Sequence, residues 1–210
     1  MTGKPFAHTA LLFAKLPVAG QVKTRLCPPL TGEQAAQLHT RLIRHNLLQL
    51  QKSNIQRVEI CYTGDISSPF WQHLKSEGWV LELQVGEDLG ARMSHAIARA
   101  LTYSQRVVVC GCDTVDLTVL RLNQLASSEP GYSAVIVPVE DGGYIAMALS
   151  QSEPLLFDGI DWGTETVLAE TKQRFKKLGM RYRQLDTCRD IDVAADLKYL
   201  PPVWLEELMR

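Results

Sequence analysis

Short apolar runs alternate with amphipathic stretches along this chain, and the alternation predicts strands that are separated by helices. Apolar runs of five to seven residues are typical of strands, whereas apolar residues that recur every three or four positions are typical of helices. The expected strands cover residues 8–14, 58–62, 79–85, 106–110, 133–139, 144–149 and 180–185. The expected helices cover residues 31–51, 70–76, 91–101, 118–126 and 164–178, with a C-terminal helix from Ala194 that is interrupted at Pro201 and Pro202.

The expected strands are continuously apolar rather than alternating, as residues 10–14 and 107–110 show. Strands that are buried on both faces have this pattern, which favours a mostly parallel sheet with helices on both sides. We find no repeat, low-complexity tract or linker. We therefore expect a single-domain three-layer α/β/α sandwich over residues 1–210. Ligands of such folds bind beyond the C-terminal ends of the strands, so the loops there are the first places to look for chemistry.

Composition restricts the possible partners. The chain has 210 residues, of which 46% are hydrophobic and 21% are charged, and its formal net charge is -1. This charge gives no general attraction for nucleic acid or an anionic membrane, and no apolar run approaches the roughly 20 residues of a membrane helix. The five cysteines form no C-x-x-C pair. We expect reduced thiols in a cytoplasmic protein, rather than a disulfide framework or a zinc site.

An acidic loop with Asp113 and Asp116 follows the strand at residues 106–110. Two carboxylates at this spacing on a turn can share one divalent cation, and their repulsion predicts a cation or a basic group nearby. The alternative is that one of them caps the helix expected from Thr118. This loop alone does not decide between the two interpretations.

A basic loop with Lys15, Gly20, Lys23 and Arg25 follows the first strand. Its three cations and its exposed backbone N–H groups suit a polyphosphate. The spacing matches neither the Walker A motif nor G-x-G-x-x-G. Taken alone, the loop is explained as well by a solvated basic surface.

The loop after the third strand contains Gly86, Asp88, Gly90 and Arg92. The two glycines would let the backbone approach a flat ligand such as a base or a ribose. The alternative is that Asp88 simply caps the helix that follows, with acidic residues stabilising the helix N-terminus. The sequence leaves Arg92 facing either the ligand or the solvent.

A turn formed by Asp141, Gly142, Gly143 and Tyr144 joins two expected strands. It could form a closely approached floor for the acceptor or for the donor sugar, with Asp141 or Tyr144 making the polar contact. Asp-Gly and Gly-Gly also form tight turns, so an ordinary β-hairpin explains the same residues.

Asp190 and Asp192 would point to the same side of an extended segment. They could supply further ligands to the metal held by Asp113, in which case one ion would reach from Asp113 to Asp190 or Asp192. The alternative is that Asp192 caps the helix expected from Ala194.

Five motifs occur in order: Phe13-Ala14-Lys15-x-Pro17-Val18-x-Gly20-x-Val22-Lys23-Thr24-Arg25-Leu26, Gly86-x-Asp88-Leu89-Gly90-x-Arg92-Met93, Gly111-x-Asp113-x-x-Asp116-Leu117, Glu140-Asp141-Gly142-Gly143-Tyr144 and Asp190-Ile191-Asp192-x-x-x-Asp196-Leu197. Together they resemble the bacterial glycosyltransferase-A-like proteins of the nucleotide-diphospho-sugar transferase superfamily, which are related to phospholactate guanylyltransferase-like proteins. The resemblance extends from Leu11 to about Leu197. It implies the nucleotide-diphospho-sugar transferase fold, a nucleotide over the N-terminal half and Mg²⁺ or Mn²⁺ held by carboxylates.

Two departures from the family pattern affect the neighbours of the aspartates. Cys112 and the pair Thr114-Val115 stand where such proteins often have Ser and Cys-Pro. Residues 193–195 replace a common Thr-Pro-Glu. The aspartates themselves are retained, so the departures bear on the acceptor and on the turn geometry rather than on the metal.

The sequence predicts a metal-dependent transferase that uses an activated nucleotide and a small acceptor. The expected catalytic residues are Asp113, Asp192 and Lys23, and the expected metal ligands are Asp113, Asp116, Asp190 and Asp192. The expected nucleotide-binding residues are Lys15, Gly20, Lys23, Arg25, Gly86, Asp88, Gly90 and Arg92, and the expected acceptor-binding residues are Asp141, Gly142, Gly143 and Tyr144. No covalent nucleophile is evident, which favours direct displacement.

Three outcomes remain open at this point. The transferred group could be a sugar from a nucleotide-sugar, as the family resemblance favours, or a nucleotidyl group from a triphosphate, as the basic loop favours. The altered residues 193–195 give some support to a third outcome, a catalytically inactive nucleotide-binding module.

Overall fold

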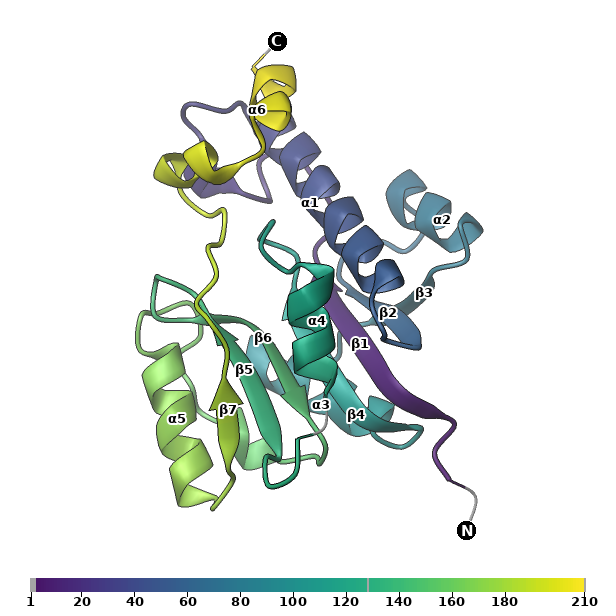
Figure 1. The fold of residues 1–210 in the computed structure, drawn as a ribbon. Coiled ribbons are helices and arrows are strands. Elements are labelled where there is room, and N and C mark those ends of the chain that lie inside the picture. Colours follow the sequence, from purple (N-terminus) through teal and green to yellow (C-terminus); the bar gives the residue numbers. More distant parts are fainter. Residues whose placement is uncertain (1–2, 128, 210) are drawn as a thin grey trace.

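A seven-stranded, mostly parallel sheet forms the centre of the molecule (Figure 1). The computed structural model describes residues 3–127 and 129–209, so Met1, Thr2, Ser128 and Arg210 lie outside the described part. The strand order is β3-β2-β1-β4-β6-β5-β7, and only β6 runs antiparallel to its neighbours. The strands are β1 (Phe6–Ala14), β2 (Arg57–Tyr62), β3 (Val80–Leu83), β4 (Ser104–Gly111), β5 (Ala134–Pro138), β6 (Tyr144–Leu149) and β7 (Tyr182–Gln184).

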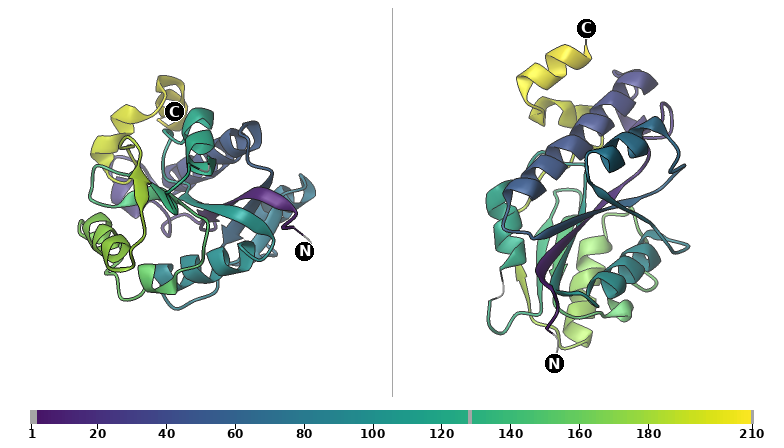
Figure 2. Two further views of the ribbon diagram at one scale, coloured as in Figure 1. Left: turned by 60° about the horizontal axis from the view of Figure 1, so that its bottom comes forward. Right: turned by 90° about the vertical axis from the view of Figure 1, so that its right-hand side faces the viewer.

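Helices cover both faces of this sheet, as the left view of Figure 2 shows. One face packs against α1 (Gly32–Lys52), α2 (Pro69–Ser76) and α4 (Val119–Ala126) through a core that includes Leu47 and Trp71. The other face packs against α3 (Leu89–Ala100) and α5 (Val167–Lys177). The predicted three-layer α/β/α sandwich is therefore confirmed.

Strand β1 shows why the apolar runs are continuous. Leu12 belongs to the core on one side of the sheet, Leu11 belongs to the core on the other side, and both are fully buried. Successive side chains of a strand point to opposite faces, so a strand that is covered twice needs an apolar residue at every position. Burying each such leucine contributes about 1.5–3 kcal/mol.

A third apolar cluster joins the first loop to the C-terminal segment. Leu26, in the short 3-10 helix η1 (Thr24–Leu26), packs with Leu38 of α1 and with Ile191. The 3-10 helix η3 (Ala194–Tyr199) and α6 (Pro202–Leu208) complete the cluster. This packing holds the basic loop against the segment that carries Asp190 and Asp192. The remaining 3-10 helix is η2 (Pro154–Leu156).

Local signals in the sequence explain where several of these elements begin and end. Thr31 and Gln34 form the expected capping box at the start of α1, with the Gln34 N–H donating to Thr31 Oγ1 at 3.2 Å. The expected interruption of the C-terminal helical segment is observed, because Pro201 has no N–H to donate to a helical hydrogen bond. The part before the interruption is the 3-10 helix η3 rather than an α-helix, and the part after it is α6. Helix α5 begins at Val167 rather than Thr164, because residues 164–166 form a loop that packs on the turn at Gly142. Among the described residues, no helix has the length and apolar character that crossing a membrane requires.

Candidate functional site

The predicted loops meet in one cleft at the C-terminal edge of the parallel strands. The register pairs Phe13 with Gly111, so the basic loop and the acidic loop leave the sheet side by side. The N–H of Cys188 donates to Pro138 O at 2.8 Å and brings residues 188–192 to the same edge. The cleft consists of three cavities of about 500, 300 and 550 Å³ that share lining residues such as Asp113, Asp141 and Asp192.

Lys23 is the best-buried cation of this cleft, and its side chain is only 3% exposed. Its ammonium lies 2.8 Å from Asp113 Oδ1 and also donates to the backbone carbonyl of Ile191. Its backbone is left-handed, with a φ of 52°, and no other non-glycine residue in the described part of the chain has a positive φ. Such backbone strain is retained where the surrounding structure imposes it, as it does at many functional sites. The loop therefore places one ammonium where three segments of the chain meet.

Asp113 is held ionised by this arrangement. Burial raises the pKa of its carboxyl, but the Lys23 ammonium and the His39 imidazole outweigh that effect and hold the pKa well below its usual range. The side chain nevertheless remains 45% exposed, so it is accessible from the cleft. The predicted basic group beside the acidic loop is thus Lys23.

Sequence reasoning missed His39, which is 4% exposed and lies on the buried face of α1. Its Nδ1 is 3.6 Å from Asp113 Oδ1, and its Nε2 is 3.1 Å from the carbonyl of Lys15. Asn46, seven residues further along the same face, donates to the carbonyls of Cys112 and Thr114 at 3.0 and 2.9 Å. Two polar residues on an apolar helix face are the sequence signal that could have revealed this support.

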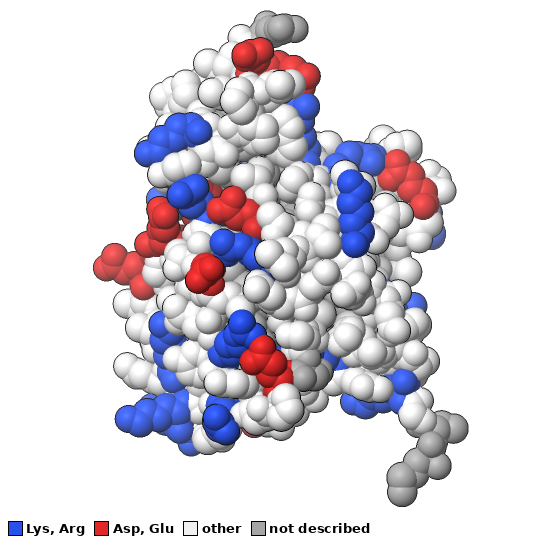
Figure 3. Space-filling model, in the orientation of Figure 1, with Lys and Arg blue, Asp and Glu red and all other residues white. Residues whose placement is uncertain are grey.

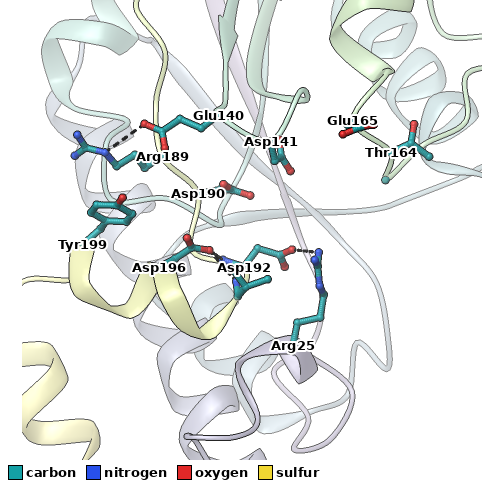
Figure 4. Close-up of a pocket in the computed structure, with 12 residues that line it drawn as sticks. Arg25, Glu140, Asp141, Thr164, Glu165, Arg189, Asp190, Asp192, Asp196 and Tyr199 are labelled. Atoms are coloured by element: carbon teal, nitrogen blue, oxygen red, sulfur yellow. Dashed lines mark hydrogen bonds and ion pairs between the residues drawn. The ribbon is translucent and has the colours of Figure 1, made fainter.

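The opposite side of the cleft is strongly acidic (Figure 4). We call it the acidic side, and it is lined by Glu140, Asp141, Glu165, Asp190, Asp192 and Asp196. Arg25 pairs with Asp192 and Arg189 lies 3.6 Å from Glu140, so two arginines face six carboxylates. Burial and the neighbouring Asp141, Asp192 and Asp196 raise the pKa of Asp190 to about 6. Elsewhere, charges of both signs are interspersed over the face seen in Figure 3.

The burial of Asp190 and the carboxylates around it predict that Asp190→Asn stabilises the metal-free protein at pH 7. The folded pKa of Asp190, about 6, lies above the usual value of about 3.9. The ionised carboxylate therefore destabilises the fold, and this destabilisation develops as the pH rises between the two values. We expect the variant to gain on the order of 1–3 kcal/mol at pH 7 and nothing below pH 4. Urea unfolding in EDTA at both pH values measures the gain. An equal difference at pH 4 and pH 7 would contradict this electrostatic explanation.

The capping interpretations of Asp113, Asp116 and Asp192 do not describe the structure. Thr118 caps α4, since its side chain accepts from the N–H of Arg121 at 3.4 Å. At the last acidic loop, the Asp196 carboxylate accepts from the N–H groups of Asp192 and Val193 at 3.0 and 2.8 Å. Asp113 and Asp192 therefore face the cleft with no capping role.

Asp116 differs from the other predicted ligands. Its carboxylate accepts from the backbone N–H of Arg189 at 3.1 Å, and the Thr114 hydroxyl donates to the backbone carbonyl of Arg189. The N–H of Ile191 donates to the Asp113 carbonyl at 2.7 Å. Asp116 is not among the residues that line the three cavities. The Asp116 carboxylate thus links the segment that carries Asp190 and Asp192 to the acidic loop after β4.

The loop from Gly86 to Arg92 borders the basic side of the cleft, which we define by Lys15, Lys23 and Arg25. Asp88 caps α3 by accepting from the N–H of Ala91 at 2.7 Å. A side chain at Gly90 would come within 2.6 Å of the Trp162 indole nitrogen. This glycine therefore allows close packing within the protein. Arg92 lines the cleft, while its Nε donates to the Gly86 carbonyl at 3.0 Å.

The Asp141 turn is a hairpin that joins β5 and β6. Gly142 has a φ of 90°, and a Cβ there would lie 2.1 Å from the Glu165 carbonyl oxygen, so this glycine is required by the protein's own packing. The Tyr144 ring lines the cleft, but its hydroxyl is buried without a hydrogen-bond partner among the described residues. Asp141 and Gly143 also line the cleft and are the polar groups of this turn that an acceptor would meet.

The residues present fit a divalent cation that is held jointly with a substrate. Asp113, Asp190 and Asp192 offer hard oxygen ligands within one cleft, and the acidic side has six carboxylates against two arginines. Their donor atoms are not gathered into a closed set. Among the described residues, one group of three or more His, Cys, Asp or Glu side chains has all its donor atoms within 4.8 Å of one another. This group is His39, Cys112 and Asp113. Mg²⁺ and Mn²⁺ tolerate such open sites, because substrate phosphates and water complete their shells.

Comparison with known proteins places the chain in a bacterial family. Residues 46–164, more than half of the chain, match the sequence profile described as "Uncharacterized protein conserved in bacteria (DUF2064)". The chain belongs to the DUF2064 family. No curated protein matches it.

Several solved structures are similar to this DUF2064 protein. A proposed nucleotide-diphospho-sugar transferase from Desulfovibrio desulfuricans G20 is 30% identical over 92% of this chain and 87% of its own, with a TM-score of 0.84. The inositol-1-phosphate CTP transferase from T. maritima is 14% identical over 98% and 96% of the two chains, with a TM-score of 0.59. A Mycobacterium tuberculosis H37Rv protein, Rv0371C, in complex with manganese is 14% identical over 97% of each chain, with a TM-score of 0.54. The predicted membership of the glycosyltransferase-A-like superfamily is confirmed.

Proposed function

We propose that this protein is a metal-dependent transferase that moves a nucleotidyl group from a nucleoside triphosphate to a small acceptor. The observation that carries the proposal is the buried Lys23 ammonium beside Asp113, at the end of β4. A nearly buried cation at a strand end, next to a partly exposed carboxylate, suits a metal-bound phosphate chain.

The nucleotide would lie on the basic side of the cleft. Lys15 and Arg25 are exposed there, and the nearly buried Lys23 lines the same cavity. The cavity of about 500 Å³ that they line also includes Phe13, Leu89 and Arg92, where a base and a ribose could lie. Gly20, Gly86, Asp88 and Gly90 would shape the walls of this nucleotide site rather than contact the phosphates.

The acceptor would enter from the acidic side. Asp141 and Gly143 would offer it polar contacts, and the adjoining cavity of about 300 Å³ has apolar walls that include Met93, Ile145 and Trp162. Asp113 and either Asp190 or Asp192 would hold Mg²⁺ or Mn²⁺ between the two substrates. The bound cation would also bring positive charge to the crowded carboxylates.

The chain's own residues would then perform three tasks. Lys23, Lys15 and Arg25 would orient the phosphates in line with the acceptor, which supplies a proximity effect. Bound Mg²⁺ or Mn²⁺ would neutralise charge that develops on the leaving pyrophosphate. Asp113 would be ionised throughout, since the pKa of its carboxyl is held low by Lys23 and His39 against the effect of burial.

Sugar transfer is the second candidate, because the Desulfovibrio desulfuricans G20 structure is described as a proposed nucleotide-diphospho-sugar transferase. Product analysis separates the candidates. The protein would be incubated with Mn²⁺, a mixture of small polyols and amines, and either a nucleoside triphosphate or a nucleotide-sugar. Pyrophosphate release supports nucleotidyl transfer, and nucleoside diphosphate release supports sugar transfer. Tight binding without any product would instead identify a nucleotide-binding module.

Arg25→Ala tests whether the basic loop meets the outer phosphates. Arg25 pairs with Asp192, but its side chain is 68% exposed and therefore has room to turn towards a ligand. We expect Arg25→Ala to weaken the binding of a triphosphate about tenfold and to leave the binding of a monophosphate almost unchanged. The reason is that each charge-assisted hydrogen bond to a phosphate contributes about 1.5–3 kcal/mol before screening. Isothermal titration of both nucleotides against both proteins measures this. Equal losses would place the loop away from the outer phosphates and favour sugar transfer.

A further inference from the structure

We propose that His39, Cys112 and Asp113 form a second kind of metal site, selective for Zn²⁺ or a similar thiophilic ion, that competes with the transferase metal for Asp113. The imidazole, thiol and carboxylate donor atoms of these residues all lie within 4.8 Å of one another. Nitrogen, sulfur and oxygen donors in this combination are typical of zinc and are a poor choice for Mg²⁺.

The imidazole of His39 is oriented as a metal ligand would be. A carbonyl oxygen can only accept, so the 3.1 Å contact with the Lys15 carbonyl places a proton on Nε2. Nδ1 makes no hydrogen bond among the described residues and faces Asp113 at 3.6 Å, so it is the nitrogen available to a metal. Any proton that Nδ1 directs at the Asp113 carboxylate in the metal-free protein would be released to solvent when the metal binds. Metal-bound histidines commonly donate their second N–H to a backbone carbonyl in this way. The ring is 4% exposed, so water has little access to the unpartnered nitrogen.

The thiol of Cys112 lies on the other side of the same carboxylate. It is 3% exposed, and its Sγ donates to Asp113 Oδ1 at 3.7 Å. Because this hydrogen bond needs the sulfhydryl proton, Cys112 is a thiol in the metal-free protein. Binding of Zn²⁺ would replace the S–H bond with a Zn–S bond and release the proton to solvent.

Lys23 is the group that Zn²⁺ must displace. Its ammonium occupies the cleft side of Asp113 at 2.8 Å and would be repelled by a dication there. The fourth coordination position would face the cleft and could take water. Because Zn²⁺ and the transferase metal would both need Asp113, occupation by one would exclude the other. This competition rests on the proposed function, but Zn²⁺ binding itself does not.

Cobalt provides a direct probe, because a thiolate ligand gives Co²⁺ a strong near-ultraviolet charge-transfer band. The titration would use the full chain with Cys27→Ser, which removes the partly exposed cysteine. We expect one equivalent of Co²⁺ to produce the band, EDTA or Zn²⁺ to abolish it, and Cys112→Ser to eliminate it. His39→Gln should weaken binding at least tenfold, while Lys23→Met should strengthen it because the competing ammonium is gone. The matched control, Cys61→Ser, should leave the band unchanged.

The result that overturns the site is a cobalt complex without a thiolate band, or a band that survives Cys112→Ser in protein whose circular dichroism is unchanged. A nucleotide titration with Mn²⁺ on a separate, cobalt-free sample of the same protein separates this from the proposed function. Nucleotide binding without a thiolate band would remove the zinc site alone. The band without nucleotide binding would remove the proposed function and leave the zinc site standing.

Discussion

Lys23→Met should lower kcat/KM for the activated nucleotide by about 10²–10³-fold, the size of effect seen when one preorganised electrostatic group is removed from an active site. Methionine keeps most of the length and apolar volume of the lysine stem but has no charge. The loss arises because a nearly buried ammonium beside Asp113 is removed from the proposed phosphate position. Pyrophosphate release at saturating acceptor measures the effect.

Lys52→Met is the matched control for this variant. Lys52 is the exposed last residue of α1, and it is not among the residues that line the cleft. We expect its kcat/KM to stay within twofold of the unmodified protein. Lys23→Met should also cost about 1–3 kcal/mol of stability, because the Ile191 carbonyl and Asp113 lose their donor. An active Lys23→Met variant would contradict the role assigned to the basic loop.

Asp113→Asn should abolish metal-dependent nucleotide binding and raise the nucleotide Kd at least 100-fold, equivalent to about 2.7 kcal/mol. Asparagine preserves the shape of the side chain but removes the charge on which both the metal and Lys23 depend. Isothermal titration with Mn²⁺ present measures the change in Kd. An unchanged Kd would show that the metal, if bound, uses other ligands.

The same substitution has a pH signature in the absence of ligand. The folded pKa of Asp113 lies below its unfolded value of about 3.9, so its charge stabilises the fold above pH 4 and the contribution is lost as the pH falls below that value. The unmodified protein should therefore be more stable than Asp113→Asn at pH 7 and should lose that advantage on acidification towards pH 2. Carboxylate repulsion alone would suggest the opposite, but the groups beside Asp113 are Lys23 and His39 rather than a second carboxylate.

The sequence predicted well which strands end in the charged loops, because the signals for these strands and loops are local. Continuous apolar runs identify β1 and β4, and the charged residues that follow them necessarily leave the sheet at its C-terminal edge. The repulsion between acidic residues also predicted a basic partner, which is Lys23.

What the sequence could not reveal depends on contacts between distant segments. Trp162 closely approaches Gly90, and Glu165 closely approaches Gly142, so neither position has room for a side chain. No local sequence pattern predicts such an approach. Asp116 matches the family motif as well as Asp113 does, yet its hydrogen bond to Arg189 crosses the fold. His39 is separated from Asp113 by more than seventy residues and was visible only as a polar residue on an apolar helix face.

The measurement that tests the central claim most directly is isothermal titration of the four ribonucleoside triphosphates and a panel of nucleotide-sugars, each with Mn²⁺ and with EDTA. The account predicts that at least one triphosphate binds with Mn²⁺, that EDTA abolishes this binding, and that Asp113→Asn and Lys23→Met each weaken it while Lys52→Met does not. If neither a triphosphate nor a nucleotide-sugar binds with or without the metal, or if binding ignores Asp113 and Lys23, the account is contradicted.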